Sequence, residues 1–385
     1  MKHKYPLLRH VNEIFSDVDL SKTLLIACQH LLGTQYQMFK ILFQMGLDPE
    51  NCFVIGKNYS TNLLVYQQLK ELGCHVDKAS IEYSPTEAFD DWFAKKIKGF
   101  LGKVLSRIDL DHFEKIVILD DGGFLIYEVA NSTLPQNKVE AVEQTSSGWH
   151  LLKDEVIDFK VFFVARSYPK LRYETPFVTK LCYERVLEHL EERELEEPKI
   201  LIIGNRGHIG SSLEARFSKQ FKTLGFDVVF DPNGKLYSLS DYFGDQLKEF
   251  DVVIGGTGSL SVSAVMLGKL KKSVSLISVS SADREFPSLL FRKEKSGLHQ
   301  NHFQSERCLV NSGFPITFYG NYHEMPANQI EITCALLMFG VLRASLKEND
   351  ERTMPHYVAA IASRLSDMYF KQIGEKDHVY TTAAL

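Results

Sequence analysis

One segment near the middle of the chain constrains the fold more than any other. Residues 202–210, Ile-Ile-Gly-Asn-Arg-Gly-His-Ile-Gly, have the form of a strand that runs into a glycine loop and then into a helix. In such a unit the loop lets the backbone approach a pyrophosphate, and the helix N-terminus supplies N–H groups and a positive dipole end. The spacing is GxxGxxG rather than GxGxxG, and a tight turn that binds nothing is the alternative. The position between a strand and a helix favours a dinucleotide site, with the predicted contacts Gly204, Gly207, His208, Ile209 and Gly210.

An acidic residue about twenty positions further along is the second part of such a site. After a helix predicted at 209–224 and a strand predicted at 227–230 comes Asp231, whose carboxylate would accept hydrogen bonds from ribose hydroxyls and repel a 2′-phosphate. Because Asp-Pro-Asn-Gly is also turn chemistry, a turn residue is an equally good interpretation. Thr257 and Gly258, after another predicted strand at 251–254, would form a second edge of the cofactor cleft. These residues predict NAD as the cofactor.

Short aliphatic runs alternate with amphipathic stretches along the chain, which is the pattern of mainly parallel sheets with crossover helices. In the first half the predicted strands are 23–27, 52–55, 116–119 and 159–165. A charge run at 191–198 marks a domain boundary. We therefore predict a two-domain α/β protein: a larger α/β substrate domain at 1–190, completed by about 320–350, a Rossmann-type NAD-binding domain at 196–318, and a helical C-terminal tail at 351–385.

Composition limits the expected partners and location. The 385 residues carry 44 basic and 49 acidic side chains spread along the chain, for a net charge of -5, so nucleic acid is not an expected partner. The basic N-terminus is followed by a polar stretch rather than by the apolar core of a signal peptide, and no apolar run has the length of a bilayer span. We expect a cytoplasmic protein without a membrane segment.

The six cysteines give no sign of a metal site or a disulfide framework. They stand at positions 28, 52, 74, 182, 308 and 334, without CxxC or Cys/His ligand spacing. Reduced, mostly buried thiols are expected, and no metal is predicted.

Five motifs follow one another along the chain: Ala-Cys-Gln-His-Leu at 27–31, Asn-Tyr-Ser-Thr at 58–61, Ile-Leu-Asp-Asp-Gly-Gly at 118–123, Val-Glu-Gln-Thr-Ser-Ser-Gly-Trp-His at 142–150, and the glycine loop. In their order and spacing, over most of its length, the chain resembles the S-adenosylhomocysteine hydrolases. The third and fourth motifs, followed by a Rossmann unit, are specific to that family. The resemblance implies a bound NAD that oxidises the substrate's 3′-hydroxyl, elimination of homocysteine, addition of water and reduction of the ketone. It also implies a homodimer or homotetramer.

The resemblance assigns roles to individual residues of this chain. It implies that His30 and Asp121 are catalytic, and that Lys170 and Glu174 handle the 3′-hydroxyl. Plain surface charge is the alternative for Lys170, and a packed histidine or a turn residue is the alternative for His30 and Asp121. The implied substrate-binding residues are Asn58, Ser60, Gln144 and Thr175, and the implied cofactor contacts outside the glycine loop are Thr145, Ser146, Ser147 and Asn311.

Several positions depart from the family's pattern. Gln144 stands where the family has a glutamate, and an amide cannot accept a proton as a base. Ser281 replaces a histidine of the active-site rim, and Leu32 and Thr34 replace residues on the adenine and ribose side. We therefore expect an altered adenosine pocket, and hydrolysis of S-adenosylhomocysteine itself that is weak or absent.

Three functions remain open from the sequence. The first is an NAD-dependent adenosylhomocysteinase-like enzyme that acts on a nucleoside or thioether related to S-adenosylhomocysteine through 3′-hydroxyl oxidation. The second is an NAD-dependent oxidoreductase of another hydroxy compound, and the third is a non-catalytic NAD-binding or regulatory homologue. Retention of His30, Asp121, Lys170 and Glu174 favours an enzyme.

Overall fold

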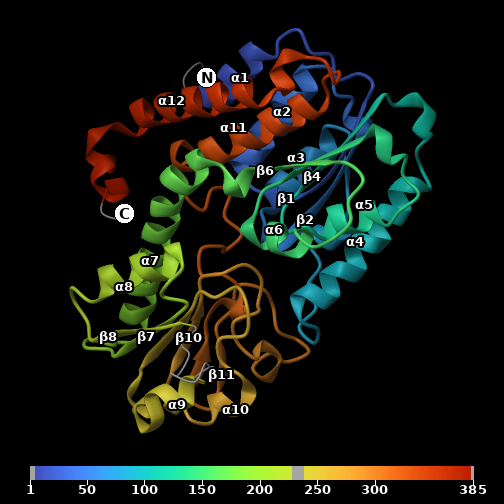
Figure 1. The fold of residues 1–385 in the computed structure, drawn as a ribbon. Coiled ribbons are helices and arrows are strands. Elements are labelled where there is room, and N and C mark those ends of the chain that lie inside the picture. Colours follow the sequence, from blue (N-terminus) through green and yellow to red (C-terminus); the bar gives the residue numbers. More distant parts are fainter. Residues whose placement is uncertain (1–4, 228–237, 383–385) are drawn as a thin grey trace.

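The computed structural model describes residues 5–227 and 238–382, which form two α/β lobes joined by a long helix (Figure 1). The upper lobe in Figure 1 contains the first part of the chain together with its C-terminal helices, and the lower lobe contains the segment between them. A sheet of mainly parallel strands lies at the centre of each lobe. The protein therefore has the two-domain α/β architecture that the alternating pattern predicts.

The first sheet has the strand order β3-β2-β1-β4-β5-β6, and all of these neighbours are parallel. Its strands are β1 (Thr23–Leu31), β2 (Cys52–Thr61), β3 (His75–Val76), β4 (Lys115–Asp120), β5 (Val139–Glu143) and β6 (Lys160–Phe163). The chain moves outward from β1 to β3 and then returns to β4 on the other side of β1. The order therefore reverses between β1 and β4, and open α/β sheets bind ligands at such a switch point.

Helices cover both faces of this sheet because its central strands are apolar on both sides. One face packs against α1 (Pro6–Ile14), α2 (Gly33–Gln44), α3 (Leu63–Glu71), α11 (Ala327–Ala344) and α12 (Pro355–Thr382), and the opposite face packs against α4 (Phe89–Leu105) and α5 (Phe124–Ala130). Gly340 lets α11 approach closely, since a Cβ there would lie 2.9 Å from the side chain of Val142. The last two helices thus complete the core of the first lobe.

The second sheet has the strand order β11-β12-β10-β9-β7-β8. Its strands are β7 (Ile200–Ile203), β8 (Thr223–Phe226), β9 (Val252–Gly255), β10 (Ser275–Ser278), β11 (His302–Gln304) and β12 (Arg307–Leu309). One face packs against α7 (Thr175–Glu192) and α8 (His208–Phe217), and the other against α9 (Leu239–Phe243) and α10 (Ala264–Leu267). The order reverses between β7 and β9, so the glycine loop that follows β7 lies at a second switch point.

The connection from β7 to β8 differs from the sequence-based prediction. The helix predicted at 209–224 was wrong at its end, because α8 stops at Phe217 and strand β8 already begins at Thr223. Of the strand predicted at 227–230, only Asp227 belongs to the described residues, and it follows β8. Gly225 permits this placement, since a Cβ there would lie 2.1 Å from the side chain of Asn205 in the glycine loop. Strand β8 therefore runs directly beside the loop.

Helix α7 belongs to both lobes. It follows directly on a π-helix, Lys170–Glu174, and Phe177 near its start packs in the core of the first lobe. Its later residues Cys182, Val186 and Leu190 pack against the second sheet. Because π-helical turns occur frequently at functional sites, the junction of the two helices is a place to look for one.

Candidate active site between the two sheets

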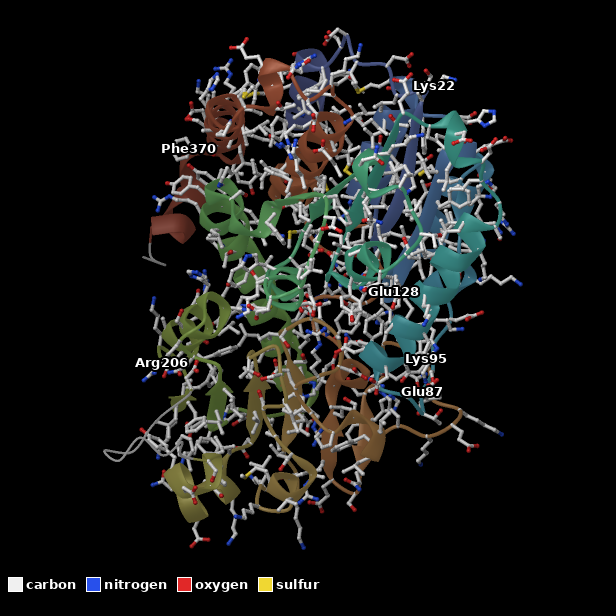
Figure 2. All side chains as sticks on the ribbon, turned by 45° about the vertical axis from the view of Figure 1, so that its right-hand side comes forward. Lys22, Glu87, Lys95, Glu128, Arg206 and Phe370 are labelled. Carbon is white, nitrogen blue, oxygen red and sulfur yellow. The ribbon has the colours of Figure 1, made fainter. Side chains whose placement is uncertain are left out.

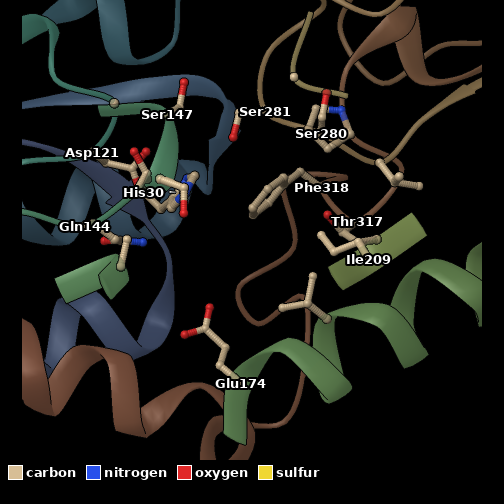
Figure 3. Close-up of a pocket in the computed structure, with 18 of the residues that line it drawn as sticks. His30, Asp121, Gln144, Ser147, Glu174, Ile209, Ser280, Ser281, Thr317 and Phe318 are labelled. Atoms are coloured by element: carbon tan, nitrogen blue, oxygen red, sulfur yellow. Dashed lines mark ion pairs between the residues drawn. The ribbon is translucent and has the colours of Figure 1, made fainter. Parts of the chain in front are cut away.

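A cavity of about 1000 Å³ lies between the two lobes (Figure 3). Such a volume at a domain interface is typical of a small-molecule site. In Figure 3 the carboxylate of Glu174 points into this space from the helix below. Further residues of both lobes line it, among them His30, Asp121, Gln144, Ser147, Ile209, Ser280, Ser281, Thr317 and Phe318.

A network of polar side chains lies at the switch point of the first sheet, between β1 and β4. His30 lies near the end of β1, and Asp121 directly follows β4, the neighbouring strand. Nε2 of His30 lies 3.1 Å from Oδ2 of Asp121, and Nδ1 lies 2.5 Å from Oγ of Ser60. The other carboxylate oxygen of Asp121 pairs with Nζ of Lys57. The structure therefore brings together His30, Asp121 and Ser60, and adds a lysine.

Lys57 is a residue that sequence reasoning missed. Its side chain is only 5 % exposed; burial opposes its charge, but Asp121 outweighs burial and raises the pKa of Lys57. Burial likewise opposes the charge of Asp121, yet His30 and Lys57 hold the pKa of Asp121 well below its usual range. Asp121 is thus kept ionised. The feature that could have identified Lys57 is its position: it is a lysine within β2, and every residue of that strand is buried.

A buried glutamate fixes the loops around this network of polar side chains. Glu143, at the end of β5, accepts hydrogen bonds from the N–H groups of Gly122 and Gly123, both at 3.0 Å. It also accepts from the N–H and the hydroxyl of Thr145, both at 2.7 Å. Burial raises the pKa of Glu143, and the nearby carboxylate of Asp120 adds to the effect. Glu143 therefore holds the turn after β4 against the start of α6 (Ser146–Leu152).

Three polar residues meet on another wall of the cavity. Nζ of Lys170 donates to the backbone carbonyl of Gln144 at 2.8 Å. Burial raises the pKa of Glu174, and the charge of Lys170 offsets this only in part. In the part of the chain that the structure describes, Oε2 of Glu174 and Oε1 of Gln144 are buried without a hydrogen-bond partner. Since such atoms are costly in a folded protein, both are available to a ligand, and Thr175 lines the same wall.

The glycine loop has the shape that a dinucleotide site requires. Gly204 has a φ of +92°, and Gly210 lets α8 approach β7, since a Cβ there would lie 2.2 Å from the carbonyl oxygen of Gly204. Gly207 differs: a Cβ there would meet only that same oxygen, at an ordinary 3.4 Å. Packing within the described residues therefore explains glycine at 204 and 210 but not at 207. Gly207, His208 and Ile209 all line the cavity.

The ribose-binding acid predicted at Asp231 lies outside the described residues. Because β8 ends at Phe226, the first acid after that strand is Asp227. Its Oδ2 accepts a hydrogen bond from the backbone N–H of Arg206 at 2.9 Å. Arg206 belongs to the glycine loop and is exposed at the surface of the second lobe (Figure 2). Asp227 therefore lies beside the loop, in the place that the sequence analysis expected for Asp231.

A second buried glutamate organises the other edge of this switch point. Glu285 accepts a hydrogen bond from the N–H of Gly258 at 2.6 Å and one from the hydroxyl of Thr257 at 2.9 Å. The hydroxyls of Ser261 and Ser280 also donate to it. Thr257 and Gly258 thus line the cavity in a loop held by Glu285. Sequence reasoning missed Glu285, since no local pattern singles it out.

The predicted cofactor residues 145–147 lie on the first lobe, at the start of α6. Thr145 caps this helix by accepting a hydrogen bond from the N–H of Gly148 at 2.9 Å. Oγ of Ser147 accepts from Nη1 of Arg284, a residue of the second lobe, at 2.7 Å. Arg284 also forms a two-point ion pair with Asp90 at the start of α4. This arginine therefore ties the lobes together at the rim of the cavity, which Thr145, Ser146 and Ser147 line.

Asn58 and Asn311 are predicted site residues that do not line the cavity. Nδ2 of Asn58 donates to a backbone carbonyl at 2.6 Å. Nδ2 of Asn311, predicted to meet the nicotinamide, donates to the backbone carbonyls of its own loop at 2.8 and 2.9 Å. Asn311 instead shapes the loop that carries Phe318, whose ring stacks on His30 with centroids 4.8 Å apart. Ser60 reaches the site through His30.

The described residues contain neither a disulfide nor a set of side chains that could bind a metal ion. All six cysteines are buried and free. The same residues hold no group of three or more His, Cys, Asp or Glu side chains that could bind a metal ion. Nor does any helix within 5–227 and 238–382 combine the length and apolarity needed to cross a lipid bilayer.

Solved structures resemble this chain only distantly. A dipicolinate synthase component from Bacillus halodurans has a TM-score of 0.36 and 10 % identity, over 69 % of this chain and 84 % of that chain. A putative D-3-phosphoglycerate dehydrogenase oxidoreductase from Ralstonia solanacearum has a TM-score of 0.37 and 10 % identity, over 89 % and 98 %. The pyruvate reductase of Chlamydomonas reinhardtii has a TM-score of 0.32 and 12 % identity, over 91 % and 97 %. At this distance the likeness assigns no activity.

Related sequences, unlike the solved structures, identify the family of this chain. No family model matches the chain. Two proteins of Mycobacterium tuberculosis, the uncharacterized proteins MT0113 and Rv0104, are each 34 % identical over 353 residues, and the match covers 88 % of this chain and 68 % of each relative. With that identity over most of its length, the chain belongs to the family of MT0113 and Rv0104.

Proposed function

We propose that this protein is an NAD-dependent oxidoreductase that acts on a hydroxyl group of a small compound bound between the lobes. One observation carries the proposal: the glycine loop and the ionisable residues His30, Asp121, Lys170 and Glu174 line the same cavity from opposite sides. The glycine loop and the pair of His30 with Asp121 each lie at the switch point of their own sheet, and ligands of open α/β folds bind at such points.

The second lobe has the features of a dinucleotide site. Gly207 leaves space over the start of α8, whose first-turn N–H groups suit a pyrophosphate. Asp227 offers a carboxylate to ribose hydroxyls and would repel a 2′-phosphate, which favours NAD over NADP. Thr257 and Gly258 would close the same side. When bound, NAD supplies the hydride acceptor of the reaction.

The first lobe supplies groups that move a proton. Oxidation of a hydroxyl requires a base for its proton, and Lys170 and Glu174 both line the cavity. Asp121, kept ionised by its neighbours, can accept a hydrogen bond from a second hydroxyl of the substrate. Phe318 stacks on His30 and excludes water from one face of that ring, which protects a reactive intermediate.

An adenosylhomocysteinase-like activity is a second candidate. It is favoured by one observation: the residues to which the resemblance assigns catalytic roles, His30, Asp121, Lys170 and Glu174, all line one cavity. The activity needs a further acid or base near the leaving group, and the amide of Gln144 cannot serve as one. Net oxidoreduction is therefore the first proposal.

Release of the bound nucleotide tests the cofactor. Purified protein is denatured in acid and the supernatant is analysed by mass spectrometry, and NAD and NADP are then titrated into stripped protein by calorimetry. NAD in the supernatant, with tighter binding of NAD than of NADP, is the expected outcome. Tighter binding of NADP, or binding of neither, would contradict the proposal.

Substrate assays separate the candidates. A panel of hydroxy compounds is incubated with protein and NAD while NADH is followed by absorbance, and S-adenosylhomocysteine is tested in parallel for release of homocysteine. NADH formation without thioether cleavage supports the oxidoreductase. Cleavage at an ordinary enzymatic rate, on the order of ten per second, would support the hydrolase instead, and Gln144→Glu should raise any weaker cleavage. Cofactor binding with neither activity would identify a non-catalytic homologue.

A further inference from the structure

A second cavity opens at the outer edge of the first sheet and shares no lining residue with the first. It measures about 450 Å³ and lies where α3 and α4, from opposite faces of the sheet, meet at the edge strand β3. Its lining includes four cations and one acid, Lys70, Lys78, Lys103, Arg107 and Asp77, together with the histidine His75. This excess of positive charge contrasts with the net charge of -5 of the whole chain.

The acid pairs with only one of these cations. Oδ1 of Asp77 accepts a hydrogen bond from the N–H of Ala79 at 2.9 Å, and Oδ2 pairs with Nζ of Lys103 at 2.7 Å. Within residues 5–227 and 238–382, neither Lys78 nor Arg107 takes part in an ion pair. Two cations on the wall of the cavity are therefore left for an anion.

The floor of the cavity is aromatic and buried. Phe53 is 3 % exposed, and the ring of His75 stacks on it with centroids 4.5 Å apart. Tyr66 and Phe100, from α3 and α4, complete the floor, and Nζ of Lys70 lies 5.4 Å from the ring centre of Tyr66. A ligand here would meet an apolar surface below and cations around its rim.

We infer that this cavity binds a small phosphorylated compound, at a site separate from the one between the lobes. Its volume lies within the range of small-molecule pockets. A lysine and an arginine match phosphate oxygens, the arginine through its planar fork of donors. The acidic residues Glu71 and Asp109 stand one position after Lys70 and two positions after Arg107, so the basic residues of the cavity do not form the long run that a nucleic-acid backbone needs.

Helix ends and edge protection account for only part of this charge. Lys70 and Lys103 stand in the last turns of α3 and α4, where a cation stabilises the C-terminus of a helix. Lysines also protect sheet edges against pairing with other chains. Lys78 and Arg107 lie outside both α-helices, so they are the residues whose removal separates ligand binding from these structural roles.

Inorganic pyrophosphate is the probe, titrated by calorimetry into the full chain. The double variant Lys78→Gln/Arg107→Gln should bind it at least about tenfold more weakly than the unmodified protein. The matched control Lys95→Gln/Lys96→Gln removes two cations from the exposed part of α4, outside the cavity, and should change the affinity less than about twofold. Because the glycine loop would also hold a pyrophosphate, the titration is repeated with protein saturated with NAD, and the affinity of the second cavity should not change.

Four results would overturn the inference. Equal losses in the double variant and the control would mean unspecific attraction, and loss of binding in the NAD-saturated protein would place pyrophosphate at the glycine loop. Absence of binding at millimolar pyrophosphate would leave no site. If the double variant aggregates but binds pyrophosphate with unchanged affinity, Lys78 and Arg107 protect the sheet edge and do not bind a ligand. If the double variant does not fold, the single variants Arg107→Gln and Arg107→Lys are compared, of which the second keeps the positive charge. If the inference is right, only Arg107→Gln binds pyrophosphate more weakly than the unmodified protein.

Discussion

The two sheet edges that meet at the central cavity share one structural feature but differ in the side chains around it. Each contains a buried glutamate that accepts hydrogen bonds from loop N–H groups and hydroxyls: Glu143 in the first lobe and Glu285 in the second. Around Glu143 lie further ionisable side chains, such as Asp120 and Asp121. Around Glu285 lie serines, a threonine and glycines.

This difference indicates how chemistry and binding are divided. Ionisable groups packed within reach of one another shift each other's pKa values, which suits the first edge to moving protons. Glycines and backbone N–H groups do not titrate near neutral pH, but they allow close approach of a phosphate, which suits the second edge to holding a cofactor. Changes on the first edge should therefore alter rate and pH dependence, and changes on the second should alter affinity.

The largest effect should follow removal of Lys170, for which we propose a role in taking the hydroxyl proton. Lys170→Ala is expected to lower NADH formation by about a hundred- to ten-thousand-fold while NAD affinity stays the same. Lys180→Ala, further along α7 and paired with Glu184, is the control and should leave the rate within about twofold. Steady-state kinetics and NAD titration measure both quantities. Loss of NAD binding in Lys170→Ala would break the proposed division.

Next in size should be loss of the buried ion pair. Lys57→Met leaves Asp121 charged and buried with one partner fewer, which should lower the free energy of unfolding by about 3–5 kcal/mol. The exposed pair of Lys248 with Asp245 offers the control, and Lys248→Met should cost less than about 1 kcal/mol. Urea unfolding measures both. Equal losses in the two variants would show that burial of the pair is not what matters.

A smaller, pH-dependent effect is expected at Asp120. Burial raises its pKa from the ordinary 3.8 to about 6, so the folded protein retains a proton that the unfolded chain releases, and the free energy of unfolding falls as pH rises from 3.8 through about 6. Asp120→Asn keeps an acceptor for the N–H of Ile126 and cannot ionise. It should be more stable than the unmodified protein by about 1–3 kcal/mol at pH 8.

The same comparison has an internal check. The stability advantage of Asp120→Asn should shrink towards zero at pH 4, where the aspartate is protonated in the folded protein. Urea unfolding at pH 4, 6 and 8 gives the curve, and the exposed Asp111→Asn serves as the control. An advantage that does not change with pH would mean that titration of Asp120 is not its cause.

The smallest effect should come from one methyl group on the second edge. Gly207→Ala has room for its Cβ and should keep its thermal stability, but it should bind NAD about tenfold more weakly, because the methyl group occupies the space of the phosphates. Gly210→Ala places a Cβ against the carbonyl oxygen of Gly204 and should instead lose about 1–3 kcal/mol of stability. Thermal melts and NAD titration of both variants decide. Unchanged affinity in Gly207→Ala would remove the loop as a phosphate site.

The sequence by itself determined the local features of the fold, namely strands and turns. The apolar runs that begin β1, β4 and β7, and the glycines that follow β4 and β7, could be read directly because strand propensity and turn chemistry act over a few residues. Once those strands are known to be parallel, His30, Asp121 and the glycine loop must lie at carboxyl edges of sheets, and the structure places them there.

What only the tertiary structure decided is which side chains meet. Lys57 pairs with Asp121 across 64 positions, and Glu285 binds Thr257 across 28, at separations where no periodic pattern operates. Asn311 turned away from the cavity because its amide finds backbone carbonyls in its own loop. Whether a buried charge or amide is stabilised depends on the partner that packing brings to it, and that partner comes from a segment chosen by the whole fold.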